Sequence, residues 1–163
     1  MTKRLLDLSG IGEERLSLAW VSSAEAQRFA DVATDIVARV KAAGPLDRTK
    51  LGMALKACRM TVDSETLRWL VGKEHRIITG GDVYGRQWTT EKYEEALNTA
   101  LEREYHKNLI YLAVAEGFTS VREISGRLSL PLKRVSYLLA DLEKTGQVEF
   151  RGMKEKKPVY AAL

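Results

Sequence analysis

The chain is poor in the residues that bind metals or form crosslinks. Its 163 residues include one cysteine, Cys58, and two histidines, His75 and His106. A single thiol excludes a disulfide within the chain, and a cysteine-ligated iron–sulfur cluster needs about four thiolates. One cysteine and two histidines, all in predicted helices, also do not form the ligand pattern of a zinc site. We therefore expect no metal or cofactor held by this chain alone.

Long apolar runs are absent as well. No apolar stretch approaches the roughly 18 residues of a membrane-spanning helix, and Asp7 interrupts the N-terminal segment that a signal peptide would need. We expect a cytoplasmic protein with no membrane contact. No catalytic set stands out either, because Ser22 and Ser23 have no histidine near them in the sequence. We therefore expect no enzymatic activity from this chain by itself.

The net charge is small and unevenly spread. The chain carries 26 basic and 22 acidic residues, for a net charge of +4. Residues 1–47 hold 6 basic and 7 acidic groups, residues 48–103 hold 10 and 8, and residues 104–163 hold 10 and 7. Dedicated DNA-binding domains are often more basic than this. The charge therefore permits nucleic acid as a partner without requiring it.

The last third of the chain has the pattern of two short helices followed by a hairpin. Ser120 and Glu123 have the spacing of a capping box, and Leu130-Pro131 predicts a turn, with Pro131 suited to a helix start. Gly146 marks the end of the second helix. The inward positions that helical spacing predicts are Val121, Ile124, Leu128, Leu132, Val135, Leu138, Leu139 and Leu142. Val148 and Phe150 alternate as in a strand, and residues 159–163 can form the returning strand.

This order of elements resembles the winged helix-turn-helix regions of MarR-like and ArsR-like regulators, with "REISGRLSLPLKRVSYLLADLEKTGQVEF" as the matching text. The resemblance implies a recognition helix and a basic wing that could bind double-stranded DNA or a protein. The predicted outward residues are Lys133, Arg134, Ser136, Tyr137 and Lys144 on the helix and Arg151, Lys154, Lys156 and Lys157 on the wing. These side chains could contact phosphates and base edges. The alternative is that they solvate an exposed surface or contact a protein.

The first 47 residues have the pattern of a piece of an α/β domain. A helix over residues 3–8 is followed by alternation over residues 16–21, which predicts a strand. Ser22 and Glu25 again have capping-box spacing. The helix that follows carries one apolar stripe: Phe29, Val32, Ala33, Ile36, Val37 and Val40. One strand cannot form a sheet alone, so it either pairs with another copy of the chain or belongs to a domain whose other part is missing.

The pattern of residues 48–103 predicts a helical connection between residues 1–47 and the C-terminal region 104–163. We expect helices over residues 48–60 and from Asp63 or Ser64 onward, and a long helix that starts at Thr89 or Thr90 and ends at Gly117. The long helix can be broken near His106 or continuous. The predicted fold class is mainly α with small β content (α+β): an α/β fragment over residues 1–47, a helical middle region over 48–103 and a C-terminal winged helix over 104–163.

A second resemblance lies in the first half. The text "KRLLDLSGIGEERLSLAWVSSAEAQRFADVATDIVARVKAAGP" is similar to the C-terminal part of the methyl-viologen-reducing hydrogenase delta subunit. "LRWLVGKE…GGDVYG" more weakly resembles an extension of some members. The family is a small iron–sulfur protein that passes electrons between a hydrogenase or formate dehydrogenase and heterodisulfide reductase. The resemblance implies a redox protein complex as partner. Independently of it, the three tryptophans Trp20, Trp69 and Trp88 are candidate core or interface anchors.

The departure from that family concerns its cofactor. Members bind a [2Fe–2S] cluster through cysteines that precede the matching region, and this chain has no residue onto which a cluster ligand can be carried. Either the chain is the C-terminal part of a longer redox subunit, or it is a fragment that kept a docking surface without the cluster. We therefore expect a non-catalytic accessory or docking module of the hydrogenase–heterodisulfide reductase system. The alternative is a winged-helix DNA-binding transcriptional regulator, which would act as a homodimer.

Overall fold

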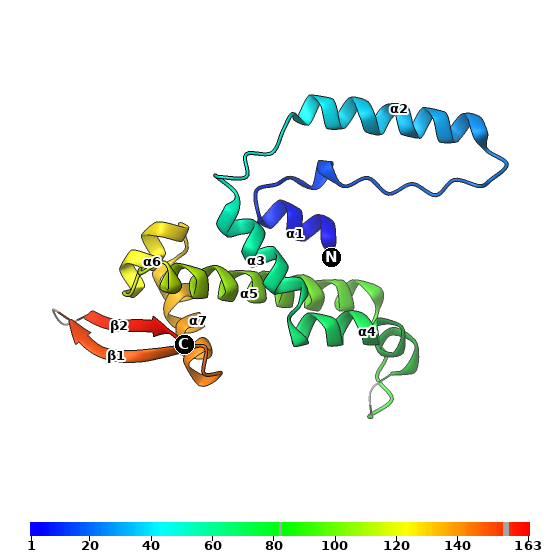
Figure 1. Ribbon diagram of the computed structural model, residues 1–163. Helices are drawn as coiled ribbons and strands as arrows, with labels where there is room; N and C mark the ends of the chain where they lie inside the picture. The colour runs from blue at the N-terminus through cyan, green and yellow to red at the C-terminus, as the bar shows by residue number, and fades with distance from the viewer. Residues whose placement is uncertain (82, 155–156) are drawn as a thin grey trace. The chain divides into compact units, whose positions relative to one another are not determined.

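The structure is a computed structural model that describes residues 1–81, 83–154 and 157–163. It is mainly helical with one two-stranded antiparallel sheet, which confirms the predicted fold class (Figure 1). The chain divides into two compact units, Met1–Gly52 and Met53–Leu163. In the described residues, no helix is long and apolar enough to cross a membrane.

The first unit contains α1 (Thr2–Leu8), a 3₁₀ turn η1 (Glu13–Arg15) and α2 (Ala26–Ala43). The side chain of Arg15 ties its parts together. Its guanidinium donates to the carbonyl oxygens of Ile11 (3.1 Å), Gly44 (2.9 Å) and Ala43 (2.6 Å). Because the last carbonyls of a helix have no partner within it, these bonds cap α2 and hold its C-terminal end at η1.

The predicted strand over residues 16–21 does not form. The backbone is extended at Leu16, but the described residues contain no strand that pairs with this segment. Residues 17–21 also make no backbone hydrogen bond to any described residue. A strand requires a neighbouring strand at a distance of about 4.8 Å, which the alternating pattern by itself does not supply.

The helix α2 forms as the periodicity predicts, but its apolar stripe is not in a core. None of its residues is buried, and Phe29 is 65% exposed. The expected serine cap also differs: α2 begins after Glu25 without a side-chain cap, although the Glu25 carboxylate accepts from the Ser22 N–H at 2.8 Å. A helix stripe is buried only where another element covers it, and within the described residues of the first unit the main element that contacts α2 is the short turn η1.

The second unit begins with α3 (Gly52–Val62), α4 (Glu65–Gly80) and α5 (Thr90–Ala115). The side chains of Ser64 and Thr89 cap α4 and α5 by accepting from backbone N–H groups three residues on. The helix α5 is continuous through His106. A buried hydrogen bond from Asn108 Nδ2 to Thr61 Oγ1 (3.0 Å) joins α5 to α3, and the Tyr93 hydroxyl donates to the Leu70 carbonyl of α4 (3.0 Å).

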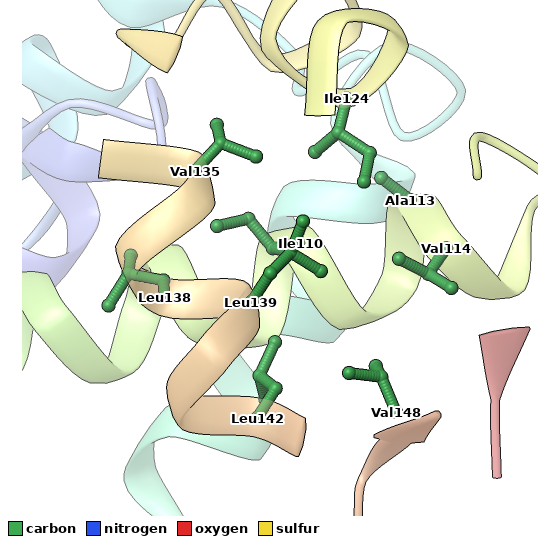
Figure 2. Packing of buried hydrophobic residues seen from close by; sticks show 9 residues of the cluster. All are labelled: Ile110, Ala113, Val114, Ile124, Val135, Leu138, Leu139, Leu142 and Val148. Atoms are coloured by element: carbon green, nitrogen blue, oxygen red, sulfur yellow. The ribbon is translucent and has the colours of Figure 1, made fainter. Parts of the chain in front are cut away.

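The remaining elements are α6 (Val121–Leu128), α7 (Leu132–Lys144), β1 (Val148–Lys154) and β2 (Lys157–Ala162). The predicted capping box is complete: the Ser120 hydroxyl accepts from the Glu123 N–H, and the Glu123 carboxylate accepts from the Ser120 N–H. These elements enclose the main hydrophobic core with one face of α5 (Figure 2). The core contains Ile110, Ala113, Val114, Ile124, Val135, Leu138, Leu139, Leu142 and Val148. Leu132, predicted to face inward, is exposed.

The hairpin is attached to this core at its open end. Val148 pairs with Ala162 and Phe150 with Tyr160, and the register shifts between Phe150 and Gly152. Such a shift marks a β-bulge, which strengthens the local twist. The Tyr160 N–H donates to the Thr119 carbonyl (2.9 Å), so β2 is also bonded to the segment before α6.

Candidate interaction surfaces

The exposed side of α7 presents two lysines and a tyrosine. Val135, Leu138, Leu139 and Leu142 are each 0% exposed and fix the inward side of the helix. Lys133, Tyr137 and Lys144 follow one another at intervals of four and seven residues, so they share the opposite side. All three and Ser136 are exposed, as predicted from their positions on the helix.

Arg134 corrects the prediction that it faces outward. Its guanidinium lies 3.6 Å from Glu102 of α5, and its side chain keeps 36% of its exposure. Its Nε is buried without a hydrogen-bond partner in the structure. Arg134 lies seven residues before Asp141, so both residues project from the side of α7 that contacts α5. Helical spacing identifies the apolar face of α7, but it does not show that α5 lies beside that face. The contact between Arg134 and Glu102 could therefore not be predicted from spacing alone.

Asp141 is the centre of an ion-pair network between α7 and α5. Its carboxylate lies 3.0 Å from Arg103 Nη2 and 3.4 Å from Lys107 Nζ. Burial opposes ionisation, but the Arg103 hydrogen bond and the two positive charges outweigh it, so the pKa of Asp141 is lowered. The Arg103 guanidinium also lies over the Tyr137 ring, 5.6 Å from its centroid. One edge of the exposed α7 side is therefore fixed to α5.

His106 lies next to this network in α5. Its Nδ1 is 3.8 Å from Glu102, the carboxylate that also pairs with Arg134. Burial lowers the pKa of His106; the charge of Glu102 opposes this shift and that of Arg134 adds to it. Within the described residues, no three histidine, cysteine or acidic side chains form a group that could hold a metal ion.

The hairpin presents basic and aromatic side chains together. Arg151 is exposed and pairs with Glu149 (3.0 Å), which reduces its availability for phosphate. Lys154 is exposed at the end of β1, and Lys157 begins β2, although its side chain is outside the description. Lys156 lies outside the described residues. The rings of Phe150 and Tyr160 meet edge to face, with centroids 5.9 Å apart.

A groove in the second unit was not predicted from the sequence. It has a volume of about 1240 Å³ and runs along one side of α5, where Ala96, Thr99 and Ala100 line it with small side chains. Trp88, 41% exposed, lines it too. Two of its basic side chains, Arg103 and Lys107, already pair with Asp141, which also lines it. The small residues at helical spacing were the only sequence signal of this groove.

In the first unit, α2 carries the charged groups next to its apolar stripe. Arg28 pairs with Glu25 (3.1 Å) and is exposed, and the Arg39 side chain is exposed near its own helix backbone. The Ser22 backbone hydrogen bond, followed by that from Arg28, lowers the pKa of Glu25. Trp20, a candidate core or interface anchor, is 92% exposed, which excludes the core position and leaves the interface one.

The comparisons with known proteins concern this first unit. Residues 1–44 match the family model of the methyl-viologen-reducing hydrogenase delta subunit, and the match does not extend to the rest of the chain. No curated protein and no solved structure matches the chain.

Proposed function

We propose that the chain is a non-catalytic docking module of a hydrogenase–heterodisulfide reductase type electron-transfer complex. The observation that carries this proposal is the match of residues 1–44 to the hydrogenase delta subunit family. These residues contain no cysteine, so the contribution we propose is attachment to redox subunits and not transfer of electrons. The second unit would act as a further interaction module.

The exposed polar groups of α2 are the surface that we assign to the redox partner. Arg28 and Arg39 are both exposed on this helix and could meet acidic groups of another subunit. Charges at the rim of an interface steer association and set the choice of partner. Since neither side chain is part of a core, changing them leaves the fold intact and tests the contact alone.

The test measures binding to the hydrogenase or heterodisulfide reductase subunits purified from the same host. Arg28→Glu and Arg39→Glu together should weaken binding by about tenfold or more. Arg122→Glu, an exposed arginine on α6, is the matched control and should leave binding unchanged. Unaltered binding by the Arg28 and Arg39 variant would refute the assigned surface, and no binding by the unmodified chain would refute the docking function.

A second candidate function is DNA binding by the C-terminal elements. Support comes from the order α5, α6, α7 and hairpin, which is that of a winged helix, and from the exposed lysines of α7. Here Lys133 and Lys144 are the phosphate-contacting candidates, while Arg134 is paired with Glu102. A homodimer would present its two α7 helices about one DNA turn, roughly 34 Å, apart.

Double-stranded DNA titrations at several salt concentrations test this candidate. Lys133→Ala and Lys144→Ala should each weaken binding and reduce the salt slope by about one. Arg134→Ala should change the slope much less, because its charge is already neutralised by Glu102. Absence of DNA binding at low salt would exclude the regulator function and leave the docking function untouched.

A further inference from the structure

The extended segment of residues 16–21 is an unpaired edge with an apolar face. Its sequence, Leu-Ser-Leu-Ala-Trp-Val, has no charged residue, no proline and no glycine. Residues 17–21 form no backbone hydrogen bond to the described part of the chain. Leu18 is 80% exposed and Trp20 is 92% exposed. Segments of this composition with free backbone groups pair readily with another strand.

Both ends of this segment are held in place. Arg15 binds the end of α2 through the Ala43 and Gly44 carbonyl oxygens, and Glu25 at the start of α2 accepts from the Ser22 N–H. The helix thus returns alongside the extended segment (Figure 1). A strand that is already extended and anchored loses less conformational entropy when it pairs.

We propose that residues 17–21 pair antiparallel with the same residues of a second copy of this chain, about a two-fold axis at Ala19. In this register Leu18 lies opposite Trp20 of the copy, and Trp20 lies opposite Leu18 of the copy. The two most exposed apolar residues of the segment therefore meet twice on one face of the sheet. Directly opposed aliphatic and aromatic side chains stabilise an antiparallel pair.

A second copy fits this edge because the segment is self-complementary. With no charge in the six residues, identical strands meet without repulsion, and a two-fold axis closes the contact after two copies. A two-stranded sheet alone is marginally stable, but each copy brings its own α2. The partly exposed stripe with Phe29 and Val40 then has a sheet to cover, as in a two-layer α/β arrangement.

A disulfide crosslink tests the register in the full chain, with Cys58→Ser as background. Ala19→Cys places the two cysteines opposite each other, and the Cα separation of about 4.5–5.5 Å for directly opposed residues permits a disulfide. Ser17→Cys is the matched control, because four residues of offset separate its two copies by about 13 Å or more. We expect Ala19→Cys to form a covalent dimer on mild oxidation and Ser17→Cys to remain largely monomeric.

Charge pairs test the same register by sedimentation velocity over a range of concentrations. In Leu18→Lys with Trp20→Glu, each lysine faces a glutamate of the copy. In Leu18→Glu with Trp20→Glu, every facing pair repels. Because both residues are exposed, neither variant disturbs a core. The opposite-charge variant should dimerise at least about tenfold more tightly than the like-charge variant.

Two results would overturn this proposal: a chain that stays at its monomer mass of 18.3 kDa at all concentrations, or equal crosslinking at positions 17 and 19. Both are measured on the purified chain without a redox subunit or DNA. The outcome is therefore separate from the docking test at Arg28 and Arg39, and either proposal can fail while the other stands.

Discussion

The helices α2 and α7 have similar amphipathic patterns and opposite surroundings. Four apolar residues of α7 are completely buried against α5, α6 and the hairpin. In α2 no residue is buried, although its apolar stripe is as regular. The difference shows that an amphipathic pattern predicts a helix with one apolar face but does not determine which element covers that face. In the second unit, α5, α6 and the hairpin cover the apolar face of α7. In the first unit, the apolar stripe of α2 has no buried residue.

The helix starts differ in the same way. At α6, both hydrogen bonds of the capping box are present. At α2, the carboxylate half exists as the Glu25 bond to Ser22, while the N-cap makes no side-chain bond to the helix. Four experiments with paired substitutions test how far the second unit depends on contacts that the first unit lacks, beginning with the largest expected effect.

Shortening one apolar side chain on α7 and one on α2 should give the largest difference in stability between the two helices. Leu139→Ala removes a side chain that is fully buried in the core and should lower the free energy of unfolding by about 3 kcal/mol. Val37→Ala, on the exposed face of α2, should change it by less than about 0.5 kcal/mol at protein concentrations where the chain is monomeric. Urea unfolding followed by circular dichroism measures both. Equal losses would mean that α2 is covered in the isolated chain.

The buried pair of Asn108 and Thr61 should come next. Asn108→Ala leaves the Thr61 hydroxyl with its bond to the Ala57 carbonyl only, and the free energy of unfolding should fall by about 1–2 kcal/mol. Thr61→Val instead leaves the Asn108 amide without its partner. A double-mutant cycle should give a coupling energy of about 1 kcal/mol. Additive losses would show that the hydrogen bond has no net effect.

Removal of the two serine hydroxyls should have a smaller effect. Ser120→Ala deletes the capping bond of α6 and should cost about 1 kcal/mol. Ser22→Ala should lower thermal stability much less, because the bond between this serine and Glu25 uses the backbone N–H and the hydroxyl accepts only a long, exposed bond from the Ala24 N–H (3.4 Å). Thermal melts of the two variants provide the comparison. A loss at Ser22 as large as that at Ser120 would contradict the difference between the two helix starts.

The smallest effect concerns pH. Because burial lowers the pKa of His106 below its usual 6.5, the unfolded chain binds more protons than the folded chain as the pH falls through that value. Stability should therefore decline on acidification below about pH 6.5. His106→Gln should flatten this decline, while His75→Gln, exposed on α4, should not. Unfolding at pH 7.5 and 5.5 tests it, and an unchanged slope in His106→Gln would refute the assignment.

Much of the fold follows from local sequence. The Ser120 capping box, the inward leucines of α7 and the return of the hairpin are set by residues close in the chain, and each was predicted. The predicted strand over residues 16–21 does not form and Trp20 is not buried, because both depend on a neighbouring element that a local pattern does not provide. For the candidate sites, the outward direction of Lys133 and Tyr137 was predictable from periodicity. The pairing of Arg134 with Glu102 was not, since it joins residues 32 positions apart.

The unbroken course of α5 has a consequence for how the second unit opens. The N-terminal half of α5 is bonded to α4 through Tyr93. Its C-terminal half is bonded to α3 through Asn108 and lies in the core with α7. Local unfolding of α3 and α4, or of α6, α7 and the hairpin, would remove packing contacts from α5, on which the remaining elements also pack. The two halves should therefore unfold as one cooperative block, and the central amides of α5 should exchange their hydrogens with solvent at a common, slow rate set by global opening.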